Sequence, residues 1–253
     1  MHDKVIACVD ESPYADAVCD YASWAAKRLG APISVLHSDA HSGSEATDHT
    51  RQQSVQDAQQ RLESQGFQAD VIPHEGELET AVAALETDIR LLVMGKRGSA
   101  SASEHGHTGK HLEKTIRAVH RPVLVTTQQF TAPSAVMIAF DGGLSACKAV
   151  DLIARSPLLQ GLPIHVVTVD ADVDGTRTPL AQARDQLCEA GFETYSTILA
   201  GEPEDVLDSY RLTHNIDLMV MGAFGQSPLR HSLLGSTTSA VLRNTHISTL
   251  VFR

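Results

Sequence analysis

The sequence contains one internal repeat: residues 4–128 can be laid over residues 135–253 with few breaks. Five strand-like apolar segments recur in the same order in both halves. The first, KVIACVDES, begins at Lys4 and corresponds to AVMIAFDGG, which begins at Ala135. Self-similarity over this length predicts two copies of one domain. The other four pairs of segments begin at Pro32 and Pro163, Gly66 and Gly191, Ile89 and Ile216, and His120 and His246.

Helical patterns separate the strand-like segments. Apolar residues recur at helical spacing from Ala15 to Leu29, where Gly30 ends the pattern, and the counterpart runs from residue 146 to about residue 159. Short apolar strands that alternate with helices indicate parallel sheets covered on both faces, because parallel strands need long crossovers. We therefore predict an α/β chain of two tandem doubly wound, Rossmann-like domains, residues 1–131 and 132–253, with a linker at residues 131–134.

Composition narrows the class of protein. Hydrophobic residues make up 42% and charged residues 20% of the chain, as in ordinary globular proteins. No apolar run approaches the roughly 20 residues of a membrane-spanning helix, and the N-terminus leads straight into a strand-like segment, so we expect neither secretion nor membrane insertion. The cysteines lack CxxC spacing and lie in apolar patterns, so we expect buried, reduced thiols and a cytoplasmic protein. They are Cys8, Cys19, Cys147 and Cys188.

The charge distribution bears on partners. The net charge is −11 and both halves are acidic, which argues against nucleic acid, since binding it requires Lys and Arg to displace counterions. Two stretches are nevertheless locally basic: residues 89–131, and the stretch after Asp217, which contains arginines and no Asp or Glu. These stretches indicate two local anion sites, or else merely solvated helix faces.

A glycine-rich segment in the second half carries the clearest chemical signal. The strand at 218–221 is followed by Gly222, Gly225 and, nine residues later, Gly235 and Ser236. Glycines tolerate positive φ and let the backbone approach a ligand, and the N–H groups of a helix at 237–244 suit a phosphate. Asp141 and Val169, which end two other strands, should face the same cleft. The alternative is an ordinary strand turn followed by a helix that Ser236 caps, with Thr237 and Thr238 in its first turn.

This pattern resembles the universal stress protein family, whose ATP-binding members carry the same glycine spacing, and the resemblance covers nearly the whole chain twice. It implies an adenine-nucleotide alpha-hydrolase-like fold that binds ATP or AMP, with or without Mg²⁺, in the second domain. Asp141 and the backbone around Phe140 would border the adenosine, and Val169 would meet the adenine. The residues expected around the ribose and phosphates are Met221, Gly222, Gly225, Gly235, Ser236 and Thr237.

The same resemblance implies an arrangement of the domains. In single-domain relatives the last strand forms the dimer, so a tandem chain should form a pseudo-dimer through the strands near residues 123–126 and 249–252. An uncovered apolar edge strand also invites association. Further oligomerisation is left open.

The first half departs from the glycine pattern. Ten residues rather than nine separate Gly98 from Gly109, Lys110 stands in the place of Ser236, and Ser38 in the place of Val169. We therefore expect one nucleotide per chain, bound by the second domain. The intervening loop carries His105, His107 and His111, and we interpret it as a solvated loop rather than a metal site, because no cysteine or cluster of acids completes a coordination shell.

The leading hypothesis is a non-enzymatic nucleotide-binding protein of stress response or signalling, in which nucleotide occupancy alters the shape of the protein or its choice of partner. No catalytic residue can be argued from spacing. Two alternatives stay open. One is a slow Mg²⁺-dependent ATPase that uses Asp141 as the acid beside the metal and Arg230 near the phosphates. The other is a nucleotide-free adaptor that binds a lipid-like or protein ligand in the crevice of the first domain.

Overall fold

The computed structural model describes residues 4–37, 45–74, 76–97, 110–170, 173–223 and 236–253. The chain divides into two compact units, residues 1–130 and 131–253, one residue away from the predicted boundary. We describe each unit by itself.

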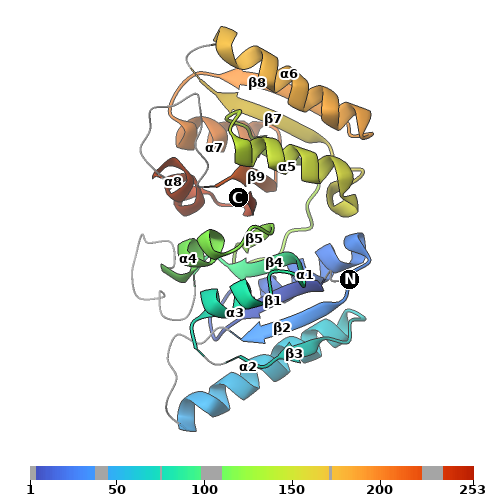
Figure 1. The fold of residues 1–253 in the computed structure, drawn as a ribbon, viewed down its shortest axis with the longest axis vertical. Coiled ribbons are helices and arrows are strands. Elements are labelled where there is room, and N and C mark those ends of the chain that lie inside the picture. Colours follow the sequence, from blue (N-terminus) through green and yellow to red (C-terminus); the bar gives the residue numbers. More distant parts are fainter. Residues whose placement is uncertain (1–3, 38–44, 75, 98–109, 171–172, 224–235) are drawn as a thin grey trace. The chain divides into compact units, whose positions relative to one another are not determined.

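Unit 1 is a five-stranded sheet with helices between its strands (Figure 1). The strand order is β3-β2-β1-β4-β5, and every pair is parallel. The elements are β1 (Lys4–Val9), α1 (Ala15–Leu29), β2 (Ile33–His37), α2 (Glu45–Ser64), β3 (Asp70–Ile72), α3 (Leu78–Ala84), β4 (Ile89–Gly95), α4 (Lys110–Ala118) and β5 (Val123–Thr126).

Unit 2 repeats this arrangement strand for strand. Its order is β8-β7-β6-β9-β10, again with parallel pairs, so the predicted pair of doubly wound domains is confirmed. The elements are β6 (Val136–Ala139), α5 (Leu144–Arg155), the 3₁₀ helix η2 (Pro157–Leu159), β7 (Ile164–Val169), α6 (Val173–Glu189), β8 (Thr194–Leu199), α7 (Pro203–Thr213), β9 (Leu218–Gly222), α8 (Ser236–Asn244) and β10 (Ser248–Phe252). We expected β5 and β10 to join the domains. Each is the last strand in the order given for its unit, and their pairing with each other stays a prediction.

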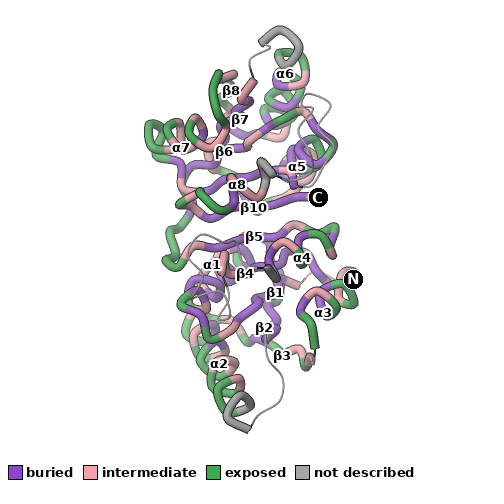
Figure 2. The backbone as a smooth tube through the Cα atoms, turned by 90° about the vertical axis from the view of Figure 1, so that its left-hand side faces the viewer, coloured by how far each residue is buried: buried purple, intermediate pink, exposed green. Residues whose placement is uncertain are grey.

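The core of each unit lies along its central strands (Figure 2). Helix α1 shows how sequence makes this core: Val18, Tyr21, Ala25 and Leu29 share one face and are all buried. Each large apolar side chain contributes about 1.5–3 kcal/mol when it leaves water. Gly30 ends the helix in the left-handed conformation, with φ of 60°, and its N–H donates to the carbonyl of Ala26.

Three expectations about local structure were wrong in detail. The helix predicted at 146–159 is two elements, because Pro157 disfavours a helical conformation at Ser156, which is extended, and a 3₁₀ turn follows. Helix α8 begins at Ser236, one residue before the predicted start. Cys147 and Cys188 are exposed rather than buried, because they lie on outward faces of α5 and α6, whereas Cys8 and Cys19 are buried.

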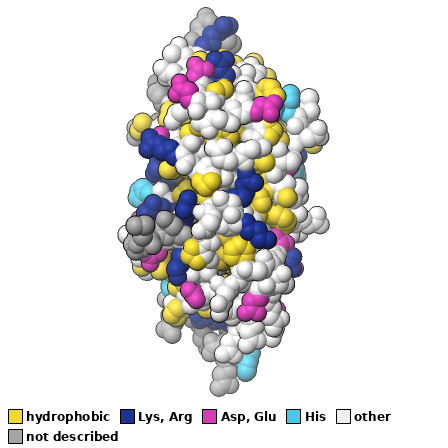
Figure 3. All heavy atoms as spheres, turned by 90° about the vertical axis from the view of Figure 1, so that its right-hand side faces the viewer, with side chains coloured by type: hydrophobic (Ala, Val, Ile, Leu, Met, Phe, Trp, Pro, Cys, Tyr) yellow, Lys and Arg dark blue, Asp and Glu magenta, His cyan; other side chains and the backbone are white. Residues whose placement is uncertain are grey.

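The surface carries no extended field of one charge on the face drawn in Figure 3. Lys and Arg side chains stand there among acidic, hydrophobic and neutral ones. Among the described residues, no helix is both long and apolar enough to cross a membrane.

Candidate functional site

The carboxyl ends of β6, β7 and β9 bring the predicted site residues of unit 2 to one edge of the sheet. Ala139 in β6 pairs with Val167 on one side and with Met221 on the other. Asp141 and Val169 each lie two residues beyond this row, and Gly222 lies one residue beyond it. Parallel strands end at a common edge, so the three positions converge although 81 residues separate the first from the last.

Asp141 occupies the turn between β6 and α5. Its Oδ1 accepts a hydrogen bond of 2.9 Å from the N–H of Gly143, and Gly142 between them adopts a positive φ of 70°. A side chain at Gly143 would meet the Asp141 carboxylate at 3.0 Å. Asp141 itself is exposed, so the turn holds a carboxylate at the rim, where it can accept hydrogen bonds from a ligand.

The backbone beside Phe140 is fixed by the neighbouring strand. The N–H of Phe140 donates to the carbonyl of Val167 at 2.9 Å, and its carbonyl accepts from the hydroxyl of Thr168 at 2.9 Å. The Phe140 side chain is buried in the sheet. Phe140 therefore supports the position of Asp141.

Gly222 is required by packing rather than by its backbone conformation. A Cβ atom at Gly222 would lie 2.7 Å from the backbone nitrogen of Ala146 and 2.9 Å from Cβ of Ser145. Its φ is not among the positive ones, so of the two properties expected of this glycine it is the missing Cβ, and not a positive φ, that the structure uses. The end of β9 thus lies directly against the first turn of α5. Met221, one residue earlier, is buried in the sheet.

Helix α8 is the element predicted to face the phosphates. It begins at Ser236, so the N–H groups of its first turn have no partner within the helix. Gly225 and Gly235 lie outside the described residues, and so do the side chains of Ser236 and Thr237. The described geometry therefore comprises the strand ends, the Asp141 turn and the start of α8.

Unit 1 has the same edge with different chemistry. Asp10 repeats the turn of Asp141, accepting from the N–H of Ser12 at 3.1 Å, and Gly95 repeats the close approach of Gly222, since a Cβ there would lie 2.7 Å from Cβ of Tyr14. Ser38, Gly98, His105, His107 and Gly109 lie outside the described residues, and so do the side chains of Lys110 and His111. His111, expected in the loop, belongs to α4.

A carboxylate–imidazole pair in unit 1 escaped the sequence analysis. Oε1 of Glu11 lies 3.1 Å from Nε2 of His37, which is the last residue of β2 and is buried. The repeat aligns Glu11 with Gly142 and His37 with Thr168. Position-by-position comparison of the halves could have revealed the pair, because both members change together.

Lys96 follows β4 at the same edge of unit 1. Burial lowers its pKa to about 8, and the positive charge of Arg97 adds to this shift. The edge of unit 1 therefore combines a lysine of lowered pKa with the Glu11–His37 pair. Within the described parts of both units, no three His, Cys, Asp or Glu side chains lie close enough together to hold a metal ion.

Comparison with known proteins gives consistent matches over both units. The family model described as the universal stress protein family matches residues 1–127 and again residues 134–253. A universal stress protein from Synechocystis sp. strain PCC 6803 is 31% identical, with 99% of each chain covered. The structure resembles the crystal structure of a universal stress protein from Archaeoglobus fulgidus DSM 4304, with a TM-score of 0.78, 20% identity, and 99% of this chain and 96% of that chain covered. A universal stress protein solved in complex with cAMP matches 49% of this chain and 98% of its own, at 25% identity and a TM-score of 0.41.

Proposed function

The chain belongs to the universal stress protein family, with one copy of the family domain in each half, and from this premise we propose that unit 2 binds ATP or AMP. The observation that carries the proposal is the convergence of Asp141, Val169 and Gly222 at one sheet edge. Helix α8 begins at Ser236, a short distance along the chain after Gly222. We propose further that occupancy of this site alters the choice of a protein partner in stress response or signalling.

The nucleoside end of the ligand suits the Asp141 turn. The hydrogen bond from Gly143 fixes the carboxylate at the rim, and the exposed carboxylate can accept from a ribose hydroxyl or from the adenine amine. Val169 supplies an apolar surface at the adjacent strand end for the flat face of adenine. Phe140 precedes Asp141, and Thr168 precedes Val169. The hydrogen bond from the Thr168 hydroxyl to the Phe140 carbonyl joins the two strand ends.

The phosphate end suits the start of α8. Free N–H groups and the positive end of the helix dipole favour an anion there. Gly222 lets β9 end against the first turn of α5, so the segment that follows leaves the sheet at the same edge. A Mg²⁺ ion bound together with the nucleotide would neutralise phosphate charge.

The two units differ where the nucleoside would lie, and this supports one nucleotide per chain. In unit 2 the positions after β6 and near the end of β7 are Gly142, which has no side chain, and Thr168, which bonds to its neighbouring strand. In unit 1 the same positions are Glu11 and His37, which contact each other across the strand ends. A bridge of two large side chains occupies space that unit 2 leaves to a ligand.

Titration of the full chain with ATP, AMP and cAMP, followed by calorimetry, tests the proposal. We expect about one ATP per chain, and at least a hundredfold weaker binding in Gly235→Asp, because a carboxylate would repel the phosphates; this corresponds to about 2.7 kcal/mol. Gly109→Asp places the same charge at the aligned position of unit 1 and should leave affinity and stoichiometry unchanged. Phosphate release measured in the same samples with Mg²⁺ separates simple binding from hydrolysis.

Equal weakening by both substitutions would contradict the assignment to unit 2. Unchanged affinity in Gly235→Asp would remove the glycine segment from the binding site. Circular dichroism spectra of both variants check that the fold persists.

A further inference from the structure

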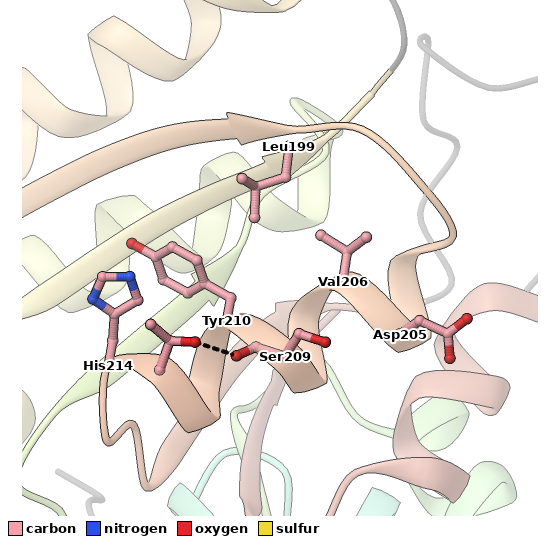
Figure 4. A pocket seen from close by; sticks show the side chains of 7 residues that line it. Leu199, Asp205, Val206, Ser209, Tyr210 and His214 are labelled. Atoms are coloured by element: carbon pink, nitrogen blue, oxygen red, sulfur yellow. Dashed lines mark hydrogen bonds between the residues drawn. The ribbon is translucent and has the colours of Figure 1, made fainter.

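Unit 2 has a second candidate site along its edge strand. A pocket of about 330 Å³ lies between the end of β8 and the length of α7 (Figure 4). Leu199 points from β8 toward α7, and Val206 points from α7 toward β8, so the two side chains face each other across the pocket. Tyr210 and His214 continue the wall along α7, and Asp205 stands toward the N-terminal end of the helix. The volume is at the lower end of the range for small-molecule sites, ~300–1,000 Å³.

The aromatic end of this pocket is held in place by a cluster of rings. The Tyr210 and His214 rings are 4.1 Å apart between centroids, and His165 stacks on Tyr195 at 4.8 Å. Nδ1 of the buried His165 and the hydroxyl of Tyr210 share a hydrogen bond of 3.0 Å. Burial and the neighbouring His214 lower the pKa of His165, which favours its neutral form. The hydrogen bond to His165 and the ring contacts hold Tyr210 in place as one wall of the pocket.

The internal repeat shows that this cluster is an addition to the shared fold. His165 and Tyr195 face each other across β7 and β8, and the aligned cross-strand pair of unit 1 is Ser34 and Asp70. The chain has only four tyrosines, and two of them lie in this one cluster. The shared fold forms in unit 1 without such a pair of rings, so the fold by itself does not require the cluster.

Charge at the other end of the pocket favours a cation. Helix α7 begins with Glu202 at its N-cap and with Glu204 and Asp205 in its first turn. Three carboxylates outweigh the roughly half positive charge of a helix N-terminus. Among the residues that the structure describes, no Lys or Arg lines the pocket, and Arg211 on the same helix pairs with Asp208 at 2.6 Å. The pocket is thus apolar and aromatic along its length and negative at one end.

We propose that the pocket between β8 and α7 binds a small organic cation with an apolar or aromatic body. The body would lie against Leu199, Val206 and the ring of Tyr210, and the ammonium group would lie toward Asp205. The rings lie at the amino end of β7 and β8, whereas Leu199 at the other end of the pocket pairs with Val169, so the pocket runs from the amino end of these strands toward the nucleotide edge.

A pair of indoles with opposite charge tests this proposal on the full chain. Tryptamine carries an ammonium group and indole-3-acetate carries a carboxylate on the same ring system. Equilibrium dialysis should give at least tenfold tighter binding of tryptamine, and ligand-observed NMR should show saturation transfer to its ring protons. Tryptamine binding should persist in Gly235→Asp, because this substitution tests the proposed nucleotide site and does not alter the pocket between β8 and α7.

Three substitutions locate the site. Val206→Arg fills the pocket and repels a cation, so it should abolish tryptamine binding; Asp205→Asn should weaken tryptamine about fivefold and leave uncharged indole unchanged. Asp185→Asn makes the same charge change on the exposed face of α6 and should have no effect. Equal affinity for the two charged indoles would overturn the proposal. So would unchanged binding in Val206→Arg with a native circular dichroism spectrum.

Discussion

The carboxylate of Glu11 lies 3.1 Å from the buried imidazole of His37, which ties the turn after β1 to the last residue of β2. The His37 side chain is 2% exposed and that of Glu11 is 28% exposed. This contact joins residues 26 positions apart. It lies at the edge of unit 1 that corresponds to the edge of unit 2 where we propose the nucleotide site.

Removal of the carboxylate should destabilise unit 1. Glu11→Ala takes a hydrogen-bond partner away from a buried nitrogen, and we expect the free energy of unfolding to fall by about 1–3 kcal/mol. Trp24 in α1 is the sole tryptophan of the chain, so its fluorescence during urea titration reports on unit 1 alone. Glu63→Ala on the exposed face of α2 is the control and should shift the value by no more than ~0.5 kcal/mol. Equal effects of the two substitutions would show that the contact is energetically unimportant.

Crowding at Gly222 should make even one methyl group costly. Gly222→Ala places Cβ 2.7 Å from the backbone of α5, so we expect a loss of about 1–3 kcal/mol in the stability of unit 2 and weaker ATP binding. Gly95→Ala is the matched control, because it meets Tyr14 at 2.7 Å in unit 1. It should lower the stability that Trp24 reports and leave ATP affinity intact. A Gly222→Ala protein with normal stability and affinity would contradict this account.

Lys96 should make the stability of unit 1 depend on pH in the alkaline range. Its pKa of about 8 in the folded protein lies below the ordinary value of 10.5. Between these values the unfolded chain holds a proton that the folded chain has released, so the contribution of Lys96 to stability rises with pH from about 8 to 10.5. The buried thiols of Cys8 and Cys19, whose pKa is raised from 9.0, act in the opposite direction above about pH 9. Partial exposure limits the gain to roughly 1–2 kcal/mol.

Lys96→Met removes this titration, so the stability of wild type relative to this variant should rise with pH across the window, as read by Trp24 fluorescence in urea. Lys27→Met, at an exposed position of α1, should keep the pH dependence of the wild type. The same pH dependence in wild type and in Lys96→Met would show that Lys96 is solvated in solution.

Thiol reactivity should divide the cysteines into two pairs. Burial raises the pKa of Cys8 and of Cys19 to about 12, whereas Cys147 and Cys188 are exposed. A thiol reagent should therefore label two sites quickly in the native protein and four sites in urea, because only an accessible thiolate reacts. Peptide mass spectrometry assigns the labels. Rapid native labelling of Cys8 would indicate that β1 is open to solvent.

The sequence by itself determined the repeat, the parallel doubly wound sheets and the meeting of Asp141, Val169 and Gly222 at one edge. Short apolar segments separated by helical patterns can bury their surface only as a parallel sheet, and parallel strands send their following turns to one edge. These properties depend on local pattern and chain direction, and so they can be recognised from the order of residues alone. The family membership of both halves follows from the same features.

Only the tertiary structure decided which side chains meet. The Glu11–His37 contact, the exclusion of a side chain at Gly222 and the ring cluster around His165 each join residues from different elements. The exposure of Cys147 depends on the rotation of α5 about its axis, which packing against the sheet sets. Such contacts depend on distances of a few ångströms between parts of the chain that are far apart in sequence. Hydrophobic periodicity predicts which face of a helix or strand is buried, but it does not predict which side chains that face will contact.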